Sequence, residues 1–321
     1  MGKYIKLFST HAEYQAFIQT DDFILPNVSY CEDQADVVHY NPYVYDYSGD
    51  YLTFVALESG TFTFTPNNSN VISYSTDDGE TWTTGNSVAV SNGDKVMWKG
   101  ELTPSYEREE GIGTFSANGN FDVQGNVMSL LYGDNYKGQT DLTGKDYAFL
   151  RLFYNNTKVV NAENLSLSAT TLASDCYNGM FNGCTNLIST PVLPATTLTN
   201  ACYGAMFEGC TSLTTAPELP ATTLAWYCYN TMFSGCTSLV SAPELPATTL
   251  ANHCYSNMFY GCTSLNYIKA MFTTTPSSTY TLDWVSGVSA TGTFVKNSAA
   301  QWNVTGIHGI PSGWTVETAS A

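Results

Sequence analysis

The most regular pattern of hydrophobic and polar positions in this chain runs from Leu172 to Leu265. Units begin at Leu172, Leu198, Leu224 and Leu250, and the third unit reads L-A-W-Y-C-Y-N-T-M-F-S-G-C-T-S-L. Successive units start 26 residues apart (224 − 198). A period of this length predicts a solenoid, in which each unit forms one coil and buries its apolar face against the neighbouring coils.

Positions that hold the same residue in every unit are expected to form the interior of this stack as ladders of like side chains. Two cysteine columns and one phenylalanine column are the predicted core ladders: Cys176, Cys202, Cys228 and Cys254; Cys184, Cys210, Cys236 and Cys262; Phe181, Phe207, Phe233 and Phe259. Three prolines that each precede an Ala-Thr-Thr-Leu segment mark a corner, because proline cannot donate a hydrogen bond to a strand ladder: Pro194, Pro220 and Pro246.

Residues 48–115 show the alternation that is typical of short β-strands. The predicted strands lie within residues 51–57, 60–64, 71–74, 81–83, 87–90 and 95–99. Turn residues separate them, and this spacing predicts a small β-sandwich, an Ig-like spacer ahead of the repeats.

Residues 116–272 are predicted to form the repeat solenoid with its N-terminal cap. Residues 152–159, L-F-Y-N-N-T-K-V, are a degenerate copy of M-F-x-G-C-T-S-L, which makes about five coils in all. Residues 121–131 are expected to supply a strand that covers the open end, and residues 273–321 to form an aromatic C-terminal cap. The expected fold class is therefore mainly β.

Residues 75–82, S-T-D-D-G-E-T-W, match the Asp-box motif known from sialidases. A sialidase site holds its substrate carboxylate with three arginines, whereas this chain has only Arg108 and Arg151. The favoured interpretation is a structural hairpin, in which Asp77 binds the turn amides and Gly79 adopts a positive φ.

The pattern L-P-x-x-x-L-x-x-C-Y-x-x-M-F-x-G-C-x-S-L resembles the leucine-rich repeats of the BspA type. The chain departs from that family at Met232-Phe233, where Ala-Phe is common, and at Cys228-Tyr229, where Ile-Gly is common. The resemblance implies a parallel β-stack, a surface location and a binding role. It does not imply chemistry.

Residues 1–47 are predicted to be an anchoring arm, because they hold too little apolar content for a core of their own. The opening K-L-F-x-T-H-x-E-Y, followed by N-V-S-Y-C and H-Y-N-P, is similar to the openings of virion proteins from crAss-like and related gut phages. That resemblance implies docking to other virion proteins. The opening residues contain no apolar signal-peptide core, so we expect synthesis in the bacterial cytoplasm without a signal peptide.

The chain carries 28 acidic and 11 basic residues, for a net charge of −17. Such a charge repels phosphate backbones and anionic lipid surfaces, so neither nucleic-acid binding nor membrane insertion is expected. The sequence contains no apolar run of the length of a membrane span.

Eight of the nine cysteines belong to the two repeat columns, and Cys31 stands apart from them. The C-x7-C spacing within a unit is too long for a zinc knuckle. Buried free thiols are the favoured interpretation, with disulfides within a coil as the alternative.

Positions that vary between units are expected to be exposed. Trp226, Tyr227, His253 and Tyr260 form the candidate recognition surface, because exposed aromatic side chains mark the recognition of proteins or sugars. The alternative interpretation is plain surface variation, or contact with a neighbouring domain.

Glu218 and Glu244 occupy the same place in successive units. Parallel strand spacing would place them about 5 Å apart, as in a retaining glycosidase pair. Repetition alone generates this pair, however, so a solvated face is favoured over catalysis.

The histidines are scattered at His11, His39, His253 and His308. No catalytic residue, cofactor or metal site is predicted, and enzyme activity is not expected.

These observations predict a structural protein of a bacteriophage virion, a head fibre or other surface appendage. The arm would dock to the particle, and the repeats would face a host-surface glycan or protein. A homo-oligomer is expected, with a trimer as the working hypothesis. The alternative is a bacterial cell-surface adhesin of the BspA type, and a carbohydrate-active enzyme is less favoured.

Overall fold

The structure is a computed structural model that describes residues 50–105 and 110–319. These residues belong to one compact unit, which runs from Ser48 to Ala321. The predicted arm, residues 1–47, lies outside the described residues, and its docking role stays a prediction.

The described chain is mainly β. Its helical content is limited to the short helix α2 (Ser129–Tyr132) and the 3-10 turn η2 (Gly133–Asn135). No helix among the described residues has the length and apolar character needed to cross a lipid bilayer.

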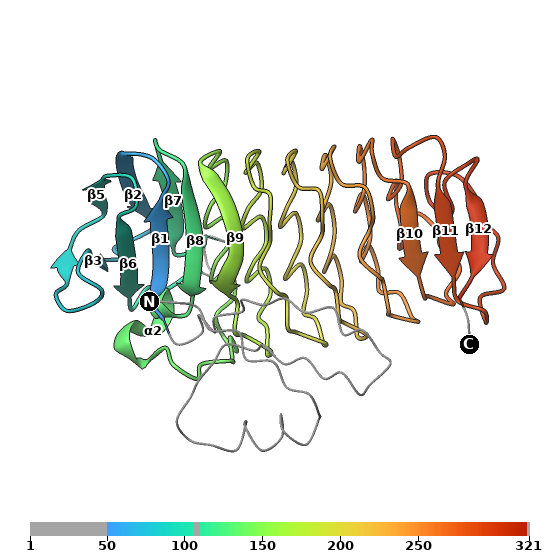
Figure 1. The fold of residues 1–321 in the computed structure, drawn as a ribbon. Coiled ribbons are helices and arrows are strands. Elements are labelled where there is room, and N and C mark those ends of the chain that lie inside the picture. The colour runs from blue at the N-terminus through green and yellow to red at the C-terminus, as the bar shows by residue number, and fades with distance from the viewer. Residues whose placement is uncertain (1–49, 106–109, 320–321) are drawn as a thin grey trace, which may run out of the picture. The chain divides into compact units, whose positions relative to one another are not determined.

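The largest sheet has the strand order β4-β3-β6-β1-β8-β9. Its strands are β1 (Leu52–Ala56), β3 (Ile72–Ser75), β4 (Thr83–Thr84), β6 (Lys95–Gly100), β8 (Phe121–Asn126) and β9 (Val159–Ser166). Pairing is antiparallel from β4 to β8, and β8 then pairs with β9 in parallel. A change from antiparallel to parallel pairing therefore falls between the N-terminal strands and the repeats (Figure 1).

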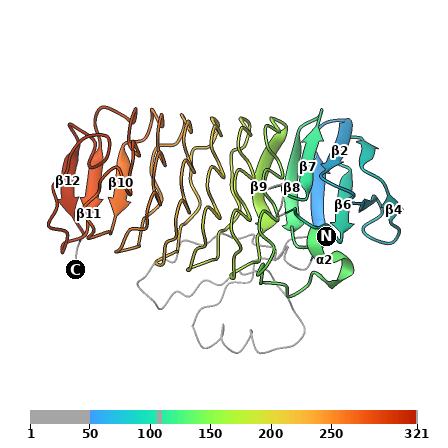
Figure 2. The ribbon, with the colours of Figure 1, turned by 180° about the vertical axis from the view of Figure 1, so that it is seen from behind.

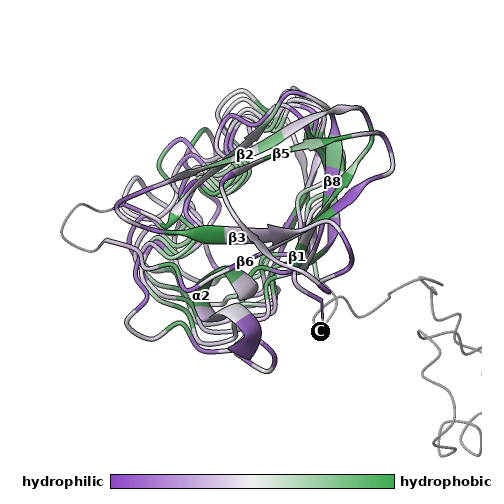
Figure 3. Ribbon diagram, turned by 90° about the vertical axis from the view of Figure 1, so that its left-hand side faces the viewer, coloured by the Kyte–Doolittle hydropathy of each residue, from purple (hydrophilic) through white to green (hydrophobic). Residues whose placement is uncertain are grey.

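A second, antiparallel sheet has the order β5-β2-β7, with strands β2 (Gly60–Pro66), β5 (Ser87–Val90) and β7 (Gly113–Ala117). Figure 3 shows β2 and β5 on one side and β1, β3 and β6 on the other. Aromatic rings fill the layer between them: Phe54 packs edge-on against Phe62 at 5.4 Å and against Phe115 at 4.7 Å. Phe115 also stacks on Phe153, so this core continues into the repeat region.

The strand predicted over residues 121–131 is present but shorter. Strand β8 ends at Asn126, where helix α2 follows; it pairs in parallel with β9 and so covers that edge of the repeat region, with β1 on its other side. Gly125 has a φ of +79°, and a Cβ there would collide with the Tyr51 carbonyl, so glycine permits the close approach of the chain before β1. The large sheet thus crosses the predicted domain boundary at 115/116, and the division into domains stays a prediction.

Between β9 and β10 (Tyr267–Ala270) the repeat units lie side by side (Figures 1 and 2). The same backbone hydrogen bond recurs from unit to unit: the Tyr177 amide donates to the Cys202 carbonyl at 3.0 Å, and the equivalent Tyr203 amide donates to the Cys228 carbonyl at 3.1 Å. All twelve side chains of the cysteine and phenylalanine columns are fully buried. The phenylalanine rings stack at 5.7 to 5.8 Å, each nearly parallel to the next.

The degenerate unit over residues 152–159 joins the same ladders. Phe153 stacks on Phe181 at 5.2 Å. Asn156 takes the place of a cysteine, and its side-chain amide donates to the Phe115 carbonyl, just as the Cys184 thiol donates to the Phe153 carbonyl. The side-chain amide of Asn156 therefore makes the hydrogen bond that a cysteine thiol makes in the next unit.

Residues 273–319 extend the stack by two more parallel strands, β11 (Thr293–Lys296) and β12 (Thr315–Thr318). The aromatic side chains predicted for the cap are buried in this extension: Trp284, Phe294, Trp302 and Trp314. Every residue of β12 is exposed, and it is the last strand of the described chain.

Candidate functional site

Each repeat unit passes through a left-handed backbone position just before its first cysteine. The residues there are Asp175, Ala201, Tyr227 and His253, with φ between 50° and 56°. This conformation brings the Cβ of an L-residue close to its own backbone and is unfavourable for bulky side chains. The two later units nevertheless place aromatic rings at this position.

These rings form one connected surface with Trp226. Tyr227 stacks on His253 at 4.8 Å with 7° between the ring planes, and Trp226 packs against Tyr227 at 5.0 Å. The His253 Nδ1 lies 3.1 Å from the Ser256 hydroxyl, which orients the imidazole. The structure therefore brings together three of the four predicted recognition residues, and we call Trp226, Tyr227 and His253 the aromatic ledge.

Exposure is concentrated at the outer edge of the ledge. The Trp226 side chain is 53% exposed, whereas Tyr227 and His253 are half-buried beneath and beside it. A half-exposed indole leaves apolar surface in contact with water, although burial of that surface would stabilise the fold.

Tyr260 belongs to a different column of the stack. It is 50% exposed, and among the described residues no ring contact joins it to the ledge. Its equivalents in the earlier units include Asn182 and Glu208, where the Asn182 amide donates to the Glu208 carboxylate at 2.8 Å. Burial raises the pKa of Glu208, and this hydrogen bond opposes the rise.

Two asparagines flank Trp226 along the stack. The Ala201 amide donates to the Trp226 carbonyl at 2.9 Å and the Tyr227 amide to the Asn252 carbonyl at 3.2 Å, while Asn200 holds the equivalent position one unit earlier. Both asparagine side chains are exposed. The sequence prediction did not include them, although the 26-residue period places one on each side of Trp226.

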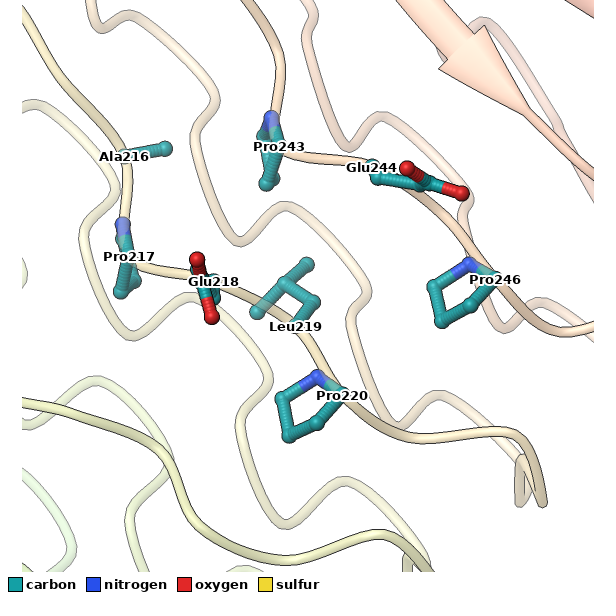
Figure 4. Close-up of a pocket in the computed structure, with 8 residues that line it drawn as sticks. All are labelled: Ala216, Pro217, Glu218, Leu219, Pro220, Pro243, Glu244 and Pro246. Atoms are coloured by element: carbon teal, nitrogen blue, oxygen red, sulfur yellow. The ribbon is translucent and has the colours of Figure 1, made fainter. Parts of the chain in front are cut away.

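The predicted carboxylate pair lines a groove of about 360 Å³ (Figure 4). Proline rings form much of its wall, at Pro217, Pro220, Pro243 and Pro246. Proline has no amide hydrogen, so these positions cannot donate to the ladder between neighbouring units. Glu244 makes an ion pair with Lys269 at 2.8 Å, and both carboxylates of the pair are exposed. The groove therefore presents two solvated carboxylates beside rigid apolar rings.

The eight repeat cysteines are free and buried. The second-column thiols donate to backbone carbonyls of the preceding unit, as in the bond from Cys210 to Phe181 at 3.2 Å. Burial raises the pKa of every one of these thiols, to about 12 for Cys184 and Cys262. Within the described residues no three histidine, cysteine, aspartate or glutamate side chains gather into a metal-binding group.

The Asp-box segment forms a tight turn held by its own side chains. Asp77 accepts hydrogen bonds from the Ser75 hydroxyl and from the Thr81 amide and hydroxyl. These bonds, with Ser75 first, lower the pKa of Asp77 to about 2. The Trp82 indole donates to the Gly79 carbonyl, and every polar group of this segment named here is used within the turn.

Comparison with protein-family models, with curated proteins and with solved structures finds no match for this chain. The aromatic ledge is the most distinct feature of the candidate site.

Proposed function

We propose that this chain is a structural protein of a bacteriophage virion, a head fibre or other surface appendage that docks through residues 1–47. Its repeat region is proposed to be a BspA-type leucine-rich-repeat solenoid of about five coils. That region displays a binding surface for a glycan or protein of the host.

The observation that carries the display role is the contrast between the two sides of each unit. Identical residues such as Phe207 and Phe233 stack in the buried interior, while the exposed position of Trp226 varies from unit to unit. A scaffold of this kind keeps its backbone constant while its surface changes. The aromatic ledge is the most apolar product of that variation, and aromatic side chains dominate the energy of many interfaces.

The virion location rests on the resemblance of residues 1–47 to phage virion proteins. A homo-oligomer, with a trimer as the working hypothesis, fits the same proposal. One ledge offers a small contact area, and several copies on one particle would bind a surface with much higher avidity than one copy alone.

A bacterial cell-surface adhesin of the BspA type is the second candidate. The ledge favours it equally, because a surface for recognition serves an adhesin as well as a fibre. A carbohydrate-active enzyme is less favoured: of its two candidate carboxylates, Glu244 makes an ion pair with Lys269.

Mass spectrometry of purified phage particles distinguishes the first two candidates. We expect peptides of this chain in intact particles at a stoichiometry comparable to that of other structural proteins. A chain without residues 1–47 should fold and yet be missing from particles. Recovery from bacterial envelopes, with absence from particles, would replace the virion proposal by the adhesin.

A further inference from the structure

The aromatic ledge stands at a backbone position that is left-handed in all four regular units. The left-handed position is filled by Asp175 and Ala201 in the earlier units, so the turn forms without a ring there. Placing Tyr227 and His253 at φ values of 56° and 54° costs about 1–2 kcal/mol each, and their mutual stacking returns about 0.5–1.5 kcal/mol. Asp175 and Ala201 bear the same backbone strain, so the stacked pair of rings is what distinguishes the two later units.

The rings also hold Trp226 in one place before any ligand arrives. Its indole leans on Tyr227 at 5.0 Å, and Tyr227 is backed by His253 at 4.8 Å. A surface that is ordered in advance loses less conformational entropy on binding.

Uncharged hydrogen-bonding residues neighbour Trp226 along the stack. Asn200 and Asn252 hold the equivalent position one unit before and one unit after it, both are exposed, and unit spacing of about 5 Å puts their backbones next to that of Trp226. Each amide supplies two donors and one acceptor oxygen, the groups that pair with hydroxyls. An exposed indole therefore has an exposed asparagine in the equivalent position of each neighbouring unit.

Charge and size narrow the class of ligand. Between Lys158 and Lys269 the sequence has no lysine or arginine, so a sialic acid, uronic acid or sulfated sugar would find neither side chain in the four regular units. A stable protein partner typically buries about 1,600 Å² in all. The ledge centres on a single half-exposed indole, and its size therefore matches one sugar ring better than a protein interface.

We propose that the aromatic ledge binds an uncharged carbohydrate, with the apolar face of one pyranose ring on the Trp226 indole and its hydroxyls on the Asn200 and Asn252 amides. This site rests on the proposed display function and names its ligand class. Tyr227 and His253 act as positioning residues that support the indole.

The test applies the purified full chain to immobilised neutral glycans, namely β-glucan, α-mannan, galactan and chitin oligosaccharides, beside sialylated and sulfated glycans. We expect binding to at least one neutral glycan and a change in tryptophan fluorescence when the matching free oligosaccharide is added. Trp226→Ala should weaken this binding at least about tenfold. Tyr260→Ala removes an equally exposed ring outside the ledge and should bind like the parent chain.

Equal binding by Trp226→Ala and the parent would overturn the site, as would binding to anionic glycans alone or to no glycan. Binding to host cells that disappears after protease treatment would instead assign the ledge to a protein partner. Because Trp226 is half exposed, Trp226→Ala should keep the melting temperature of the parent chain. If that temperature falls, Trp226→Phe is the second variant, because it retains an aromatic ring. Recovery of Trp226→Ala in particles separates this test from that of the virion role, which depends on residues 1–47.

Discussion

The Tyr227 and His253 rings stack at 4.8 Å although both residues hold a left-handed backbone conformation. The same two residues therefore bear backbone strain and make a stabilising ring contact between neighbouring units. Their balance is measurable, because Ala201 holds the same backbone conformation one unit earlier without a ring.

Replacing Ala201 by glycine should raise the free energy of unfolding by about 0.5–1 kcal/mol, because glycine adopts a positive φ without steric cost. Tyr227→Gly relieves the same strain but loses the contacts with Trp226 and His253, so it should gain less or become destabilising. Urea unfolding of the two variants against the parent measures both. A larger gain for Tyr227→Gly than for Ala201→Gly would show that the ring stack contributes nothing to stability.

The phenylalanine column should dominate the stability of the repeats. Phe233 is fully buried between Phe207 and Phe259, at 5.7 and 5.8 Å. Phe233→Ala should cost about 3–5 kcal/mol, because it removes apolar burial and leaves a cavity between two rings. Val192→Ala, at a side chain that is 72% exposed, is the control and should change stability by less than about 0.5 kcal/mol. Similar melting temperatures for the two variants would contradict the ladder as the main source of stability.

The repeat thiols should be unreactive in the native protein. A thiol must lose its proton to react, and burial raises the pKa of Cys202 and Cys254 to about 12. In a Cys31→Ser variant, which removes the cysteine outside the described residues, a thiol-specific reagent at pH 8 should label no site until the chain is unfolded. Rapid labelling of the native variant would show that the cysteine columns open to solvent.

The same thiols should make stability fall at alkaline pH. Their folded pKa lies above the unfolded value of about 8.5, so the unfolded chain loses protons first as pH rises. Stability is then fully present below about pH 8.5 and declines from there toward pH 12. Urea midpoints of the Cys31→Ser variant at pH 7.5, 9 and 10.5 measure the trend, and a constant midpoint would contradict it.

Acid should loosen the hairpin at Asp77. The pKa of this carboxyl is lowered to about 2 by hydrogen bonds from Ser75 and Thr81, against about 3.9 in an unfolded chain. The stabilisation is therefore present above about pH 4 and is lost as pH falls toward 2. The protection factor of the Thr81 amide, which corrects its exchange rate for the intrinsic dependence on pH, should fall over that range, and in Asp77→Asn it should be low already at pH 7. Asp78→Asn, one residue along, is the control and should exchange like the parent.

The repeat period alone was enough to predict which side chains are buried. An identical residue every 26 positions must stack on its own copy, and so Cys202 and Phe207 could be assigned to the interior without coordinates. The same logic singled out Trp226 as exposed. Local alternation likewise located most of the N-terminal strands, because each pattern depends only on neighbours in sequence.

Pairing between distant strands could not be predicted in this way. Strand β8 covers the edge of β9 as predicted, but its antiparallel pairing with β1 was not predicted, because that pairing depends on hydrogen bonds to a segment about 70 residues away. Helix α2 follows it for a similar reason: the Ser129 hydroxyl is held by the Trp98 carbonyl, a partner 31 residues distant in sequence.

For the candidate site, the sequence by itself determined the period and the variable positions, which follow from the chain's own repetition. Only the tertiary structure decided that the Tyr227 and His253 rings stack face to face and that Trp226 packs against Tyr227. The physical reason is that a side chain's direction within a coil depends on the backbone φ at that residue, and the left-handed turn before each first cysteine sets it.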